Sequence, residues 1–256
     1  MHSITAAILA ANNEGEITDC LGSVAWADEV LVVLDTRSVD RTAALARDRG
    51  ARVLPHLFHD FADQRNYALD QAGGEWVFFL DTDERCTPAL AKELRTVVER
   101  ADVDGWWIPR RNIIFGHEMR HGGWYPDCQL RLLRRACARY DRHRQVHEVV
   151  LLEGPAGYLS EPLIHYNYRD VAQFGAKQRQ YVALEAQIRF HDGIRPRPWT
   201  YVLQPLREFW RRYVSLQGYR DGWHGLRLCA LVAYHYGLLV TCRLGRLWRE
   251  NKKGRG

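Results

Sequence analysis

The sequence predicts an α/β protein, in which a mostly parallel sheet is flanked by helices and followed by a helical C-terminal extension. Between residues 4 and 100, short apolar runs alternate with segments of helical spacing, and this alternation is typical of consecutive βαβ units. From residue 170 onward helical spacing returns. The composition, 46% hydrophobic and 26% charged over 256 residues, suits one sizeable folded domain with an appendage.

The predicted strands of the first hundred residues are short and apolar, because a strand covered on both faces has no polar side. We expect strands at residues 4–9, 29–34, 51–54 and 76–80. We expect the intervening helices at residues 14–24, 40–49, 62–72 and 88–100. Gly73-Gly74 is a typical helix stop, and Thr87-Pro88 is a typical helix start.

The second half of the chain has a different character. Residues 105–135 are dense in aromatic residues, arginine and glycine. We expect one strand at 129–133 and another at 147–152. Two apolar stripes then have helical spacing: Tyr181, Leu184 and Ile188, followed by Val202, Leu206, Phe209, Tyr213 and Leu216. We therefore expect a first domain at residues 1–168 and a helical region at 169–256. Residues 226–242 are the most apolar but fall short of the roughly 20 residues that span a membrane.

The cysteines and the charges bear on the compartment. Six cysteines are scattered without a CxxC pair or zinc-like spacing, which is typical of a reducing cytosol. The apolar stretch Ile4–Ala11 lacks a basic region before it, so we expect no signal peptide. The net charge of +5 is uneven, because residues 207–255 are rich in arginine, and such a tail suits a membrane surface or nucleic acid.

Polar side chains follow the predicted strands at the points where the strands end. They are Asn12, Glu14, Asp35, Ser38, Asp40, Arg65, Asp81 and Asp83. Because the carboxyl ends of parallel strands share one edge, we expect these residues to meet at one crevice. A divalent cation that holds a diphosphate suits such a set, since hard cations share carboxylate and phosphate oxygens. The alternative is helix capping, for which Ser38 and Asp40 serve almost equally well.

Three segments resemble the family-two inverting glycosyltransferases with the GT-A (Rossmann-like) fold: VVLDTRSVDRT (Val32–Thr42), QRNYAL (Gln64–Leu69) and EWVFFLDTDER (Glu75–Arg85). HGGWYPDCQLRLLRR (His121–Arg135) and VHE (Val146–Glu148) resemble the bacterial subgroup of lipopolysaccharide core biosynthesis. The resemblance covers nearly the whole chain. It implies metal-dependent transfer of a sugar, with inversion, from a nucleotide-diphosphate donor (a UDP-sugar) to a lipid-linked glycan such as lipopolysaccharide core.

The resemblance also implies a role for each matching residue. Asp127 is placed like the catalytic base. Nucleotide contacts are implied for Asn12, Glu14, Asp35, Arg65 and Asp81, and binding of Mg²⁺ or Mn²⁺ for Asp81 and Asp83. Acceptor-binding or supporting roles are implied for Trp124, Tyr125, Gln129, Arg131, His147 and Glu148. Two positions depart from the family: Ala10-Ala11 stands where Thr and Lys are usual, and Arg37 stands where Gly is common.

Several of these residues have a structural alternative. Trp124 and Tyr125 stack on a sugar or pack in an aromatic core. His147-Glu148 holds the acceptor, or is a satisfied histidine beside a strand-edge acid. Arg110-Arg111 meets phosphates on the acceptor, or belongs to a solvated charged face.

The arginine-rich C-terminal helices also have two interpretations. They are an interfacial surface that lies on anionic lipid, or a lid that packs its apolar stripe on the core. The arginines are Arg207, Arg211, Arg212, Arg243, Arg246 and Arg249, and the apolar residues beside them are Trp210, Tyr213, Leu244, Leu247 and Trp248. We favour the lipid surface, so we expect a cytoplasmic protein that is peripheral on the inner face of the cytoplasmic membrane.

Two other classes of function have weaker support. A nucleotidyltransferase shares the sheet and the carboxylate pair, but the segment Ala10–Gly15 has one glycine and no basic residue in place of a glycine-rich basic loop. A nucleic-acid-binding protein would suit the basic aromatic tail. The acidic crevice would repel the phosphate backbone of a nucleic acid, so we expect no nucleic-acid partner.

Overall fold

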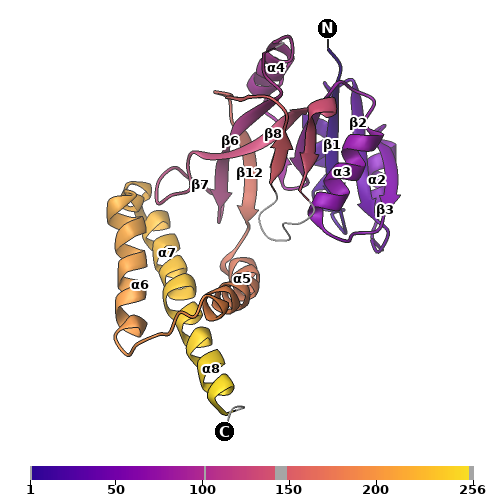
Figure 1. Cartoon of the computed structure of the whole chain (residues 1–256). Coiled ribbons are helices and arrows are strands. Elements are labelled where there is room, and N and C mark those ends of the chain that lie inside the picture. Colours follow the sequence, from indigo (N-terminus) through magenta and orange to yellow (C-terminus); the bar gives the residue numbers. More distant parts are fainter. Residues whose placement is uncertain (1, 101, 142–148, 254–256) are drawn as a thin grey trace. The chain divides into compact units, whose positions relative to one another are not determined.

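The computed structural model describes residues 2–100, 102–141 and 149–253, and the chain divides into two compact units (Figure 1). The first unit comprises Met1–Arg110 and Asp127–His165, and the second comprises Arg111–Pro126 and Tyr166–Gly256. Residues 111–126 thus belong with the C-terminal helices, a grouping that the sequence pattern did not indicate.

The predicted α/β class, with a mostly parallel sheet flanked by helices, is confirmed. Within the described residues, ten strands form one mixed sheet with the main order β3-β2-β1-β4-β8-β6-β12-β5. Its parallel part is β1 (Ile4–Ala10), β2 (Glu29–Asp35), β3 (Arg52–His56) and β4 (Trp76–Asp81). The strand β8 (Asp127–Arg134) is antiparallel to both β4 and β6 (Gly105–Ile114).

The remaining elements complete the sheet and its cover. The shorter strands are β5 (Glu84–Arg85), β7 (His117–Met119), β11 (Ala156–Tyr158) and β12 (Leu163–Tyr168), and β9 (Ala138–Tyr140) pairs with β10 (Val150–Leu152) apart from the main sheet. The helices of the first unit are α1 (Ile17–Ser23), α2 (Thr42–Asp48), α3 (Phe61–Gln71), α4 (Pro88–Val97) and the single 3₁₀ turn η1 (Arg135–Cys137).

The continuous apolar runs exist because the parallel strands are buried on both faces. Ile4, Ala6 and Ile8 of β1 pack in one core cluster with α1, α2 and α4. Ala7 and Leu9 of the same strand point to the opposite face, where α3 packs. Successive side chains of a strand point to opposite faces, so a strand between two helical layers needs apolar residues at every position.

Gly74 lies where two backbone segments approach closely. A Cβ at this position would lie 2.7 Å from the backbone N of Thr5 and 2.8 Å from its Oγ1. We expect Gly74→Ala to lower the free energy of unfolding by about 1–3 kcal/mol, the cost of overpacking a well-filled site. Urea denaturation measures this loss.

The matched control is Gly22→Ala on the exposed side of α1, where a Cβ would meet nothing within 4 Å. Because alanine favours a helix over glycine, this variant should equal the wild type or exceed it by up to about 1 kcal/mol. Equal stability of both variants would show that the approach of Gly74 to β1 is not tight.

The second unit is mainly helical. Its elements are α5 (Val171–His191), α6 (Thr200–Trp210), η2 (Arg211–Ser215), η3 (Gly218–Asp221), α7 (Gly222–Val232), η4 (Ala233–Leu239) and α8 (Val240–Lys253). Figure 1 shows α7 and α8 as one long rod with α6 beside α7. Val240 and Leu244 of α8 pack against Val182 and Ala186 of α5, with Leu247 and Trp248 around them. The apolar side of α8, which was expected to face lipid, therefore packs on the protein.

One helical run in the described chain, Gly218–Lys252, is long and apolar enough to cross a membrane by length and composition, with a mean hydropathy of 1.3. Half of the most apolar 18-residue stretch of this run is buried inside the protein. The sequence indicated a shorter apolar piece, because Arg227 and His235 interrupt it.

Candidate active site

Asp35 ends β2 and is held by the arginine two residues later. The Nη2 of Arg37 lies 2.8 Å from Asp35 Oδ2, and the Nε of Arg37 donates to both carboxylate oxygens at 3.1 Å. These hydrogen bonds from Arg37 lower the pKa of Asp35 to about 2. The arginine that departs from the family pattern thus keeps the predicted nucleobase-binding acid ionised.

Asn12 and Glu14 lie against the loop that follows β2. The Oδ1 of Asn12 accepts a hydrogen bond from the backbone N of Val39 at 3.0 Å. Glu14 Oε2 accepts from the Nε of Arg41 at 3.3 Å. The segments after β1 and β2 therefore meet at the carboxyl edge of the sheet, as expected for parallel strands.

Asp81 ends β4 between two buried arginines. The Nη2 of Arg65, on α3, lies 3.2 Å from Asp81 Oδ1, and the Nη2 of Arg131, on β8, lies 2.5 Å from Asp81 Oδ2. Burial among these groups opposes ionisation, but the Arg131 and Arg65 guanidiniums hold the pKa of Asp81 well below its usual range. The guanidinium of Arg65 also lies over the rings of Phe79 and Tyr140, at 5.4 and 5.6 Å from their centroids.

Charges of alternating sign continue from Asp81 across the sheet. Arg131 Nη2 donates to Glu84 Oε1 at 2.9 Å, and the Nη1 of Arg110 donates to the same oxygen at 3.3 Å. Arg110 Nη2 in turn lies 2.6 Å from Asp127 Oδ2. The side chain of Glu84 is fully buried. We name this set the charge ladder: Arg65, Asp81, Arg131, Glu84, Arg110 and Asp127.

Asp127, the predicted base, is fixed from two sides. It lies directly opposite Arg110 in the β6–β8 register. Its other oxygen, Oδ1, accepts a hydrogen bond from the Nε2 of Gln129 at 3.0 Å. The side chain keeps 28% exposure, so a substrate hydroxyl can reach it. The structure thus brings Asp127, Gln129 and Arg131 to the same sheet edge as Asp81.

Asp83 lies beside a histidine that the sequence did not single out. The Nε2 of His165, on β12, lies 3.5 Å from Asp83 Oδ2. No group of three or more His, Cys, Asp or Glu side chains gathers for a metal within the described residues. Mg²⁺, however, commonly takes one or two carboxylates and fills its other positions with substrate phosphates and water. Asp83 fits that pattern, whereas both oxygens of Asp81 are bonded to arginines.

The other predicted acceptor residues lie in different parts of the chain. Trp124 and Tyr125 belong to the second unit. Trp124 is partly buried against a core cluster of that unit, and its backbone O accepts from Asn112 Nδ2 at 2.9 Å, whereas Tyr125 is 42% exposed. His147 and Glu148 lie outside the described residues.

Arg110 and Arg111 both form ion pairs with carboxylates of the protein. Arg110 belongs to the charge ladder, and Arg111 forms an ion pair with Glu118. These partners could not be predicted from the sequence, because they lie on other strands.

The depressed pKa of Asp81 predicts how acid affects stability. A lowered folded-state pKa contributes stability above the unfolded value of 3.8, and this contribution is lost as the pH falls through the folded-state pKa. We expect the difference in unfolding free energy between the wild type and Asp81→Asn to be largest near neutral pH and to shrink below about pH 4. Urea titrations at several pH values measure it. A difference that does not change with pH would mean that the ionised carboxylate contributes nothing.

Comparison with known proteins identifies the family to which the chain belongs. Residues 5–166 match the glycosyl transferase family 2 model, which is more than half of the chain. The chain belongs to glycosyl transferase family 2. This family is inverting, and its members are glycosyltransferases, which favours the transferase interpretation over the nucleotidyltransferase one.

Individual relatives of this family 2 protein extend over most of it. It is similar to the "Lipopolysaccharide core biosynthesis glycosyltransferase LpsC" of Rhizobium meliloti (strain 1021), with 29% identity over 248 residues, 94% of this chain and 91% of the relative. An uncharacterised glycosyltransferase of Rickettsia bellii (strain RML369-C) is 24% identical, over 75% of this chain and 69% of its own.

Among solved structures, glucosyl-3-phosphoglycerate synthase of Mycobacterium tuberculosis, in complex with Mn²⁺, UDP and glucosyl-3-phosphoglycerate, is 16% identical. It covers 71% of this chain and 78% of its own, with a TM-score of 0.47.

Proposed function

We propose that this family 2 enzyme uses a divalent metal and transfers a sugar, with inversion, from a UDP-sugar to the lipid-linked glycan of bacterial lipopolysaccharide core. The observation that carries the proposal is the charge ladder, which links the predicted base Asp127 to Asp81 at the end of β4. The acceptor class is supported by the similarity to LpsC over 94% of the chain.

Asp127 would act as the general base. An acceptor hydroxyl is a weak nucleophile, and a carboxylate within hydrogen-bond reach takes its proton while the new glycosidic bond forms. Arg110 and Gln129 hold the two oxygens of Asp127, which fixes the direction from which the hydroxyl attacks. A single displacement of this kind inverts the anomeric centre.

Arg65, Asp35 and Asp83 would serve the donor. The departing nucleoside diphosphate gains negative charge, and Arg65, close to the end of β4, would stabilise it most in the transition state. Asp35 would accept a hydrogen bond from the nucleobase, with Asn12 and Glu14 shaping the same edge. Mg²⁺ or Mn²⁺ held by Asp83, with His165 as a neighbouring donor, would neutralise the diphosphate.

We place the enzyme in the cytoplasm, peripheral on the inner face of the cytoplasmic membrane, because a lipid-linked acceptor is presented there. Residues 1–168 would form the transferase domain, and residues 169–256 the region that meets the membrane. Trp124, Tyr125, Arg131, His147 and Glu148 stay candidates for contacts with the acceptor or support of the site.

A transfer assay tests the proposal. The purified protein is incubated with UDP-sugars, Mn²⁺ and truncated lipopolysaccharide core acceptors, and the product is analysed by mass and by NMR of the new anomeric centre. We expect transfer of one sugar with inversion, abolished by EDTA and by Asp83→Ala. The matched control is Asp102→Ala, which removes an aspartate that pairs with Arg100 at the surface. Retention of configuration, or full activity in EDTA, would contradict the proposed mechanism.

A further inference from the structure

The helix α6 presents its apolar side to solvent. Five large apolar residues at its N-cap and along it are between 54% and 63% exposed. We call them the outer face of α6: Trp199, Val202, Leu203, Leu206 and Trp210. Their spacing follows a helical stripe, so they lie together on one side. An amphipathic helix of a water-soluble protein normally turns such a stripe inward, and a contiguous exposed stripe indicates an interaction surface.

The opposite side of α6 is fixed to the rest of the unit. A Cβ at Gly237 of η4 would lie 2.4 Å from the Cα of Pro205, so the two backbones are in direct contact. A Cβ at Gly245 of α8 would lie 2.2 Å from the Tyr201 hydroxyl. These glycines let α6 dock closely through Tyr201 and Pro205. The outer face is therefore exposed because of how the helix is docked, and no residue of α6 is buried.

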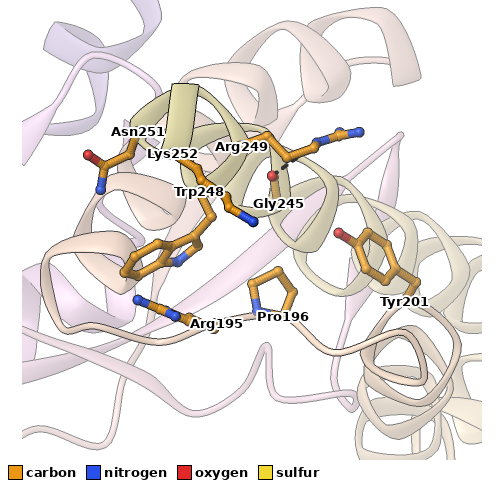
Figure 2. Close-up of a pocket in the computed structure, with 8 residues that line it drawn as sticks. All are labelled: Arg195, Pro196, Tyr201, Gly245, Trp248, Arg249, Asn251 and Lys252. Carbon is orange, nitrogen blue, oxygen red and sulfur yellow. Dashed lines mark hydrogen bonds between the residues drawn. The ribbon is translucent and has the colours of Figure 1, made fainter. Parts of the chain in front are cut away.

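A basic pocket of about 750 Å³ lies at the start of the same helix. Figure 2 shows its lining side chains, which come from residues 195–196, from Tyr201 of α6 and from α8. Three of them are cationic: Arg195, Arg249 and Lys252. The guanidinium of Arg195 lies 4.3 Å from the ring centroid of Trp248, which holds it at the pocket wall.

We propose that the outer face of α6 and this basic pocket dock the second unit on an anionic bilayer, with a lipid phosphate in the pocket. Tryptophan is favoured at the interface between lipid and water, and Trp199 and Trp210 stand at the two ends of the stripe. Cations beside an apolar stripe suit anionic lipid. The exposed Arg207 on the same helix suits an anionic surface better than the like-charged face of a second copy.

This inference refines the proposed membrane location by naming the surface and the ligand chemistry, and in that respect it rests on the proposed function. The arginine-rich tail alone indicated α8 as much as α6. The structure favours α6, because the apolar side of α8 packs on α5 while that of α6 is exposed.

Co-sedimentation with vesicles tests the inference. We expect the full-length wild type to bind vesicles that contain phosphatidylglycerol and to bind phosphatidylcholine vesicles much less. The double variant Val202→Asp/Leu206→Asp and the single variant Trp210→Ala should bind these vesicles at least ~10-fold less, because they lose apolar area that the bilayer would bury. The matched control is Leu151→Asp on β10, which changes an equally exposed leucine of the first unit and should bind like the wild type. Circular dichroism and thermal melting confirm that each variant is folded.

The pocket has its own matched pair of variants. Arg249→Gln removes a lining cation, whereas Arg246→Gln removes an exposed arginine of α8 that does not line the pocket. We expect Arg249→Gln to lose most of the preference for phosphatidylglycerol and Arg246→Gln to keep it. Inorganic phosphate should weaken the binding of the wild type by competing for the pocket. Equal effects of the two substitutions would overturn the assignment of the pocket.

Two further outcomes would overturn the whole inference. One is vesicle binding that the α6 variants leave unchanged. The other is a wild-type dimer by light scattering that the α6 variants convert to monomer, without vesicle binding, which would make a second copy the occupant. UDP titration without lipid separates this inference from the proposed function: α6 variants should bind UDP normally, and absent UDP binding with intact vesicle binding would refute the proposed function alone.

Discussion

Asp127→Asn is expected to lower the turnover number by about 10²- to 10⁴-fold, because asparagine cannot take the proton of the acceptor hydroxyl. Asparagine has the same shape, and its single amide oxygen can still accept a hydrogen bond from Arg110, while its amide nitrogen takes the place of the oxygen that accepts from Gln129. We therefore expect binding of the donor nucleotide to be largely unchanged. Steady-state kinetics at saturating donor and acceptor, together with UDP titration, separate the two quantities.

Two further variants test whether the carboxylate of Asp127 itself is the base. Arg110→Gln removes the ion pair with Asp127 but leaves the carboxylate, so a smaller loss than that of Asp127→Asn is expected. Glu148→Gln tests whether Glu148, the acid of the VHE segment, is the base instead. Activity near that of the wild type in Asp127→Asn, with a large loss in Glu148→Gln, would transfer the role of base to Glu148.

Glu84→Ala is expected to cost about 3–5 kcal/mol of unfolding free energy, because it removes the buried carboxylate that Arg131 and Arg110 share. Glu84 is fully buried, and its side chain holds Arg110, Arg131 and the backbone N of Asp81 together. Denaturant unfolding measures the loss. Glu84→Gln should fall between the wild type and Glu84→Ala, because the amide keeps a hydrogen-bond acceptor without the charge.

The matched control for this prediction is a surface ion pair. Asp102 and Arg100 are paired at 2.8 Å with side chains that are 67% and 55% exposed, so Asp102→Ala should cost less than about 1 kcal/mol. If Glu84→Ala costs no more than Asp102→Ala, the ladder is not a buried electrostatic unit, and its proposed role in fixing Asp127 loses its basis.

The sequence predicted the parallel half of the fold well because burial on both faces leaves a clear signal. The run Trp76–Leu80 is apolar throughout, and the structure places it in the middle of the sheet as β4. The edge at which Asp81 and Arg65 meet followed from the geometry of parallel strands. Helix ends were less certain: the helix expected at 88–100 ends at Val97.

The strand expected at 129–133 is present as the antiparallel β8, but β6 and β12 were not predicted, for a physical reason. β6 reads GWWIPRRNII, with a proline and two arginines, and its buried positions do not alternate regularly. β12 reads LIHYNY, in which His165 is buried whereas the neighbouring Tyr166 is exposed. These two strands carry Arg110 and His165, whose partners Glu84 and Asp83 are distant in sequence. Side chains that pair across a sheet leave no periodic mark, so the ladder became visible only in the fold.

The most direct test of the central claim is calorimetric titration of the purified protein with UDP, GDP and ADP, first with Mn²⁺ and then with EDTA. We expect UDP to bind in the presence of Mn²⁺, EDTA to abolish this binding, and Asp83→Ala to abolish it while Asp102→Ala does not. Absence of binding by all three nucleotides, with or without metal, would mean that the acids at the strand ends are structural, and it would contradict the proposed donor site.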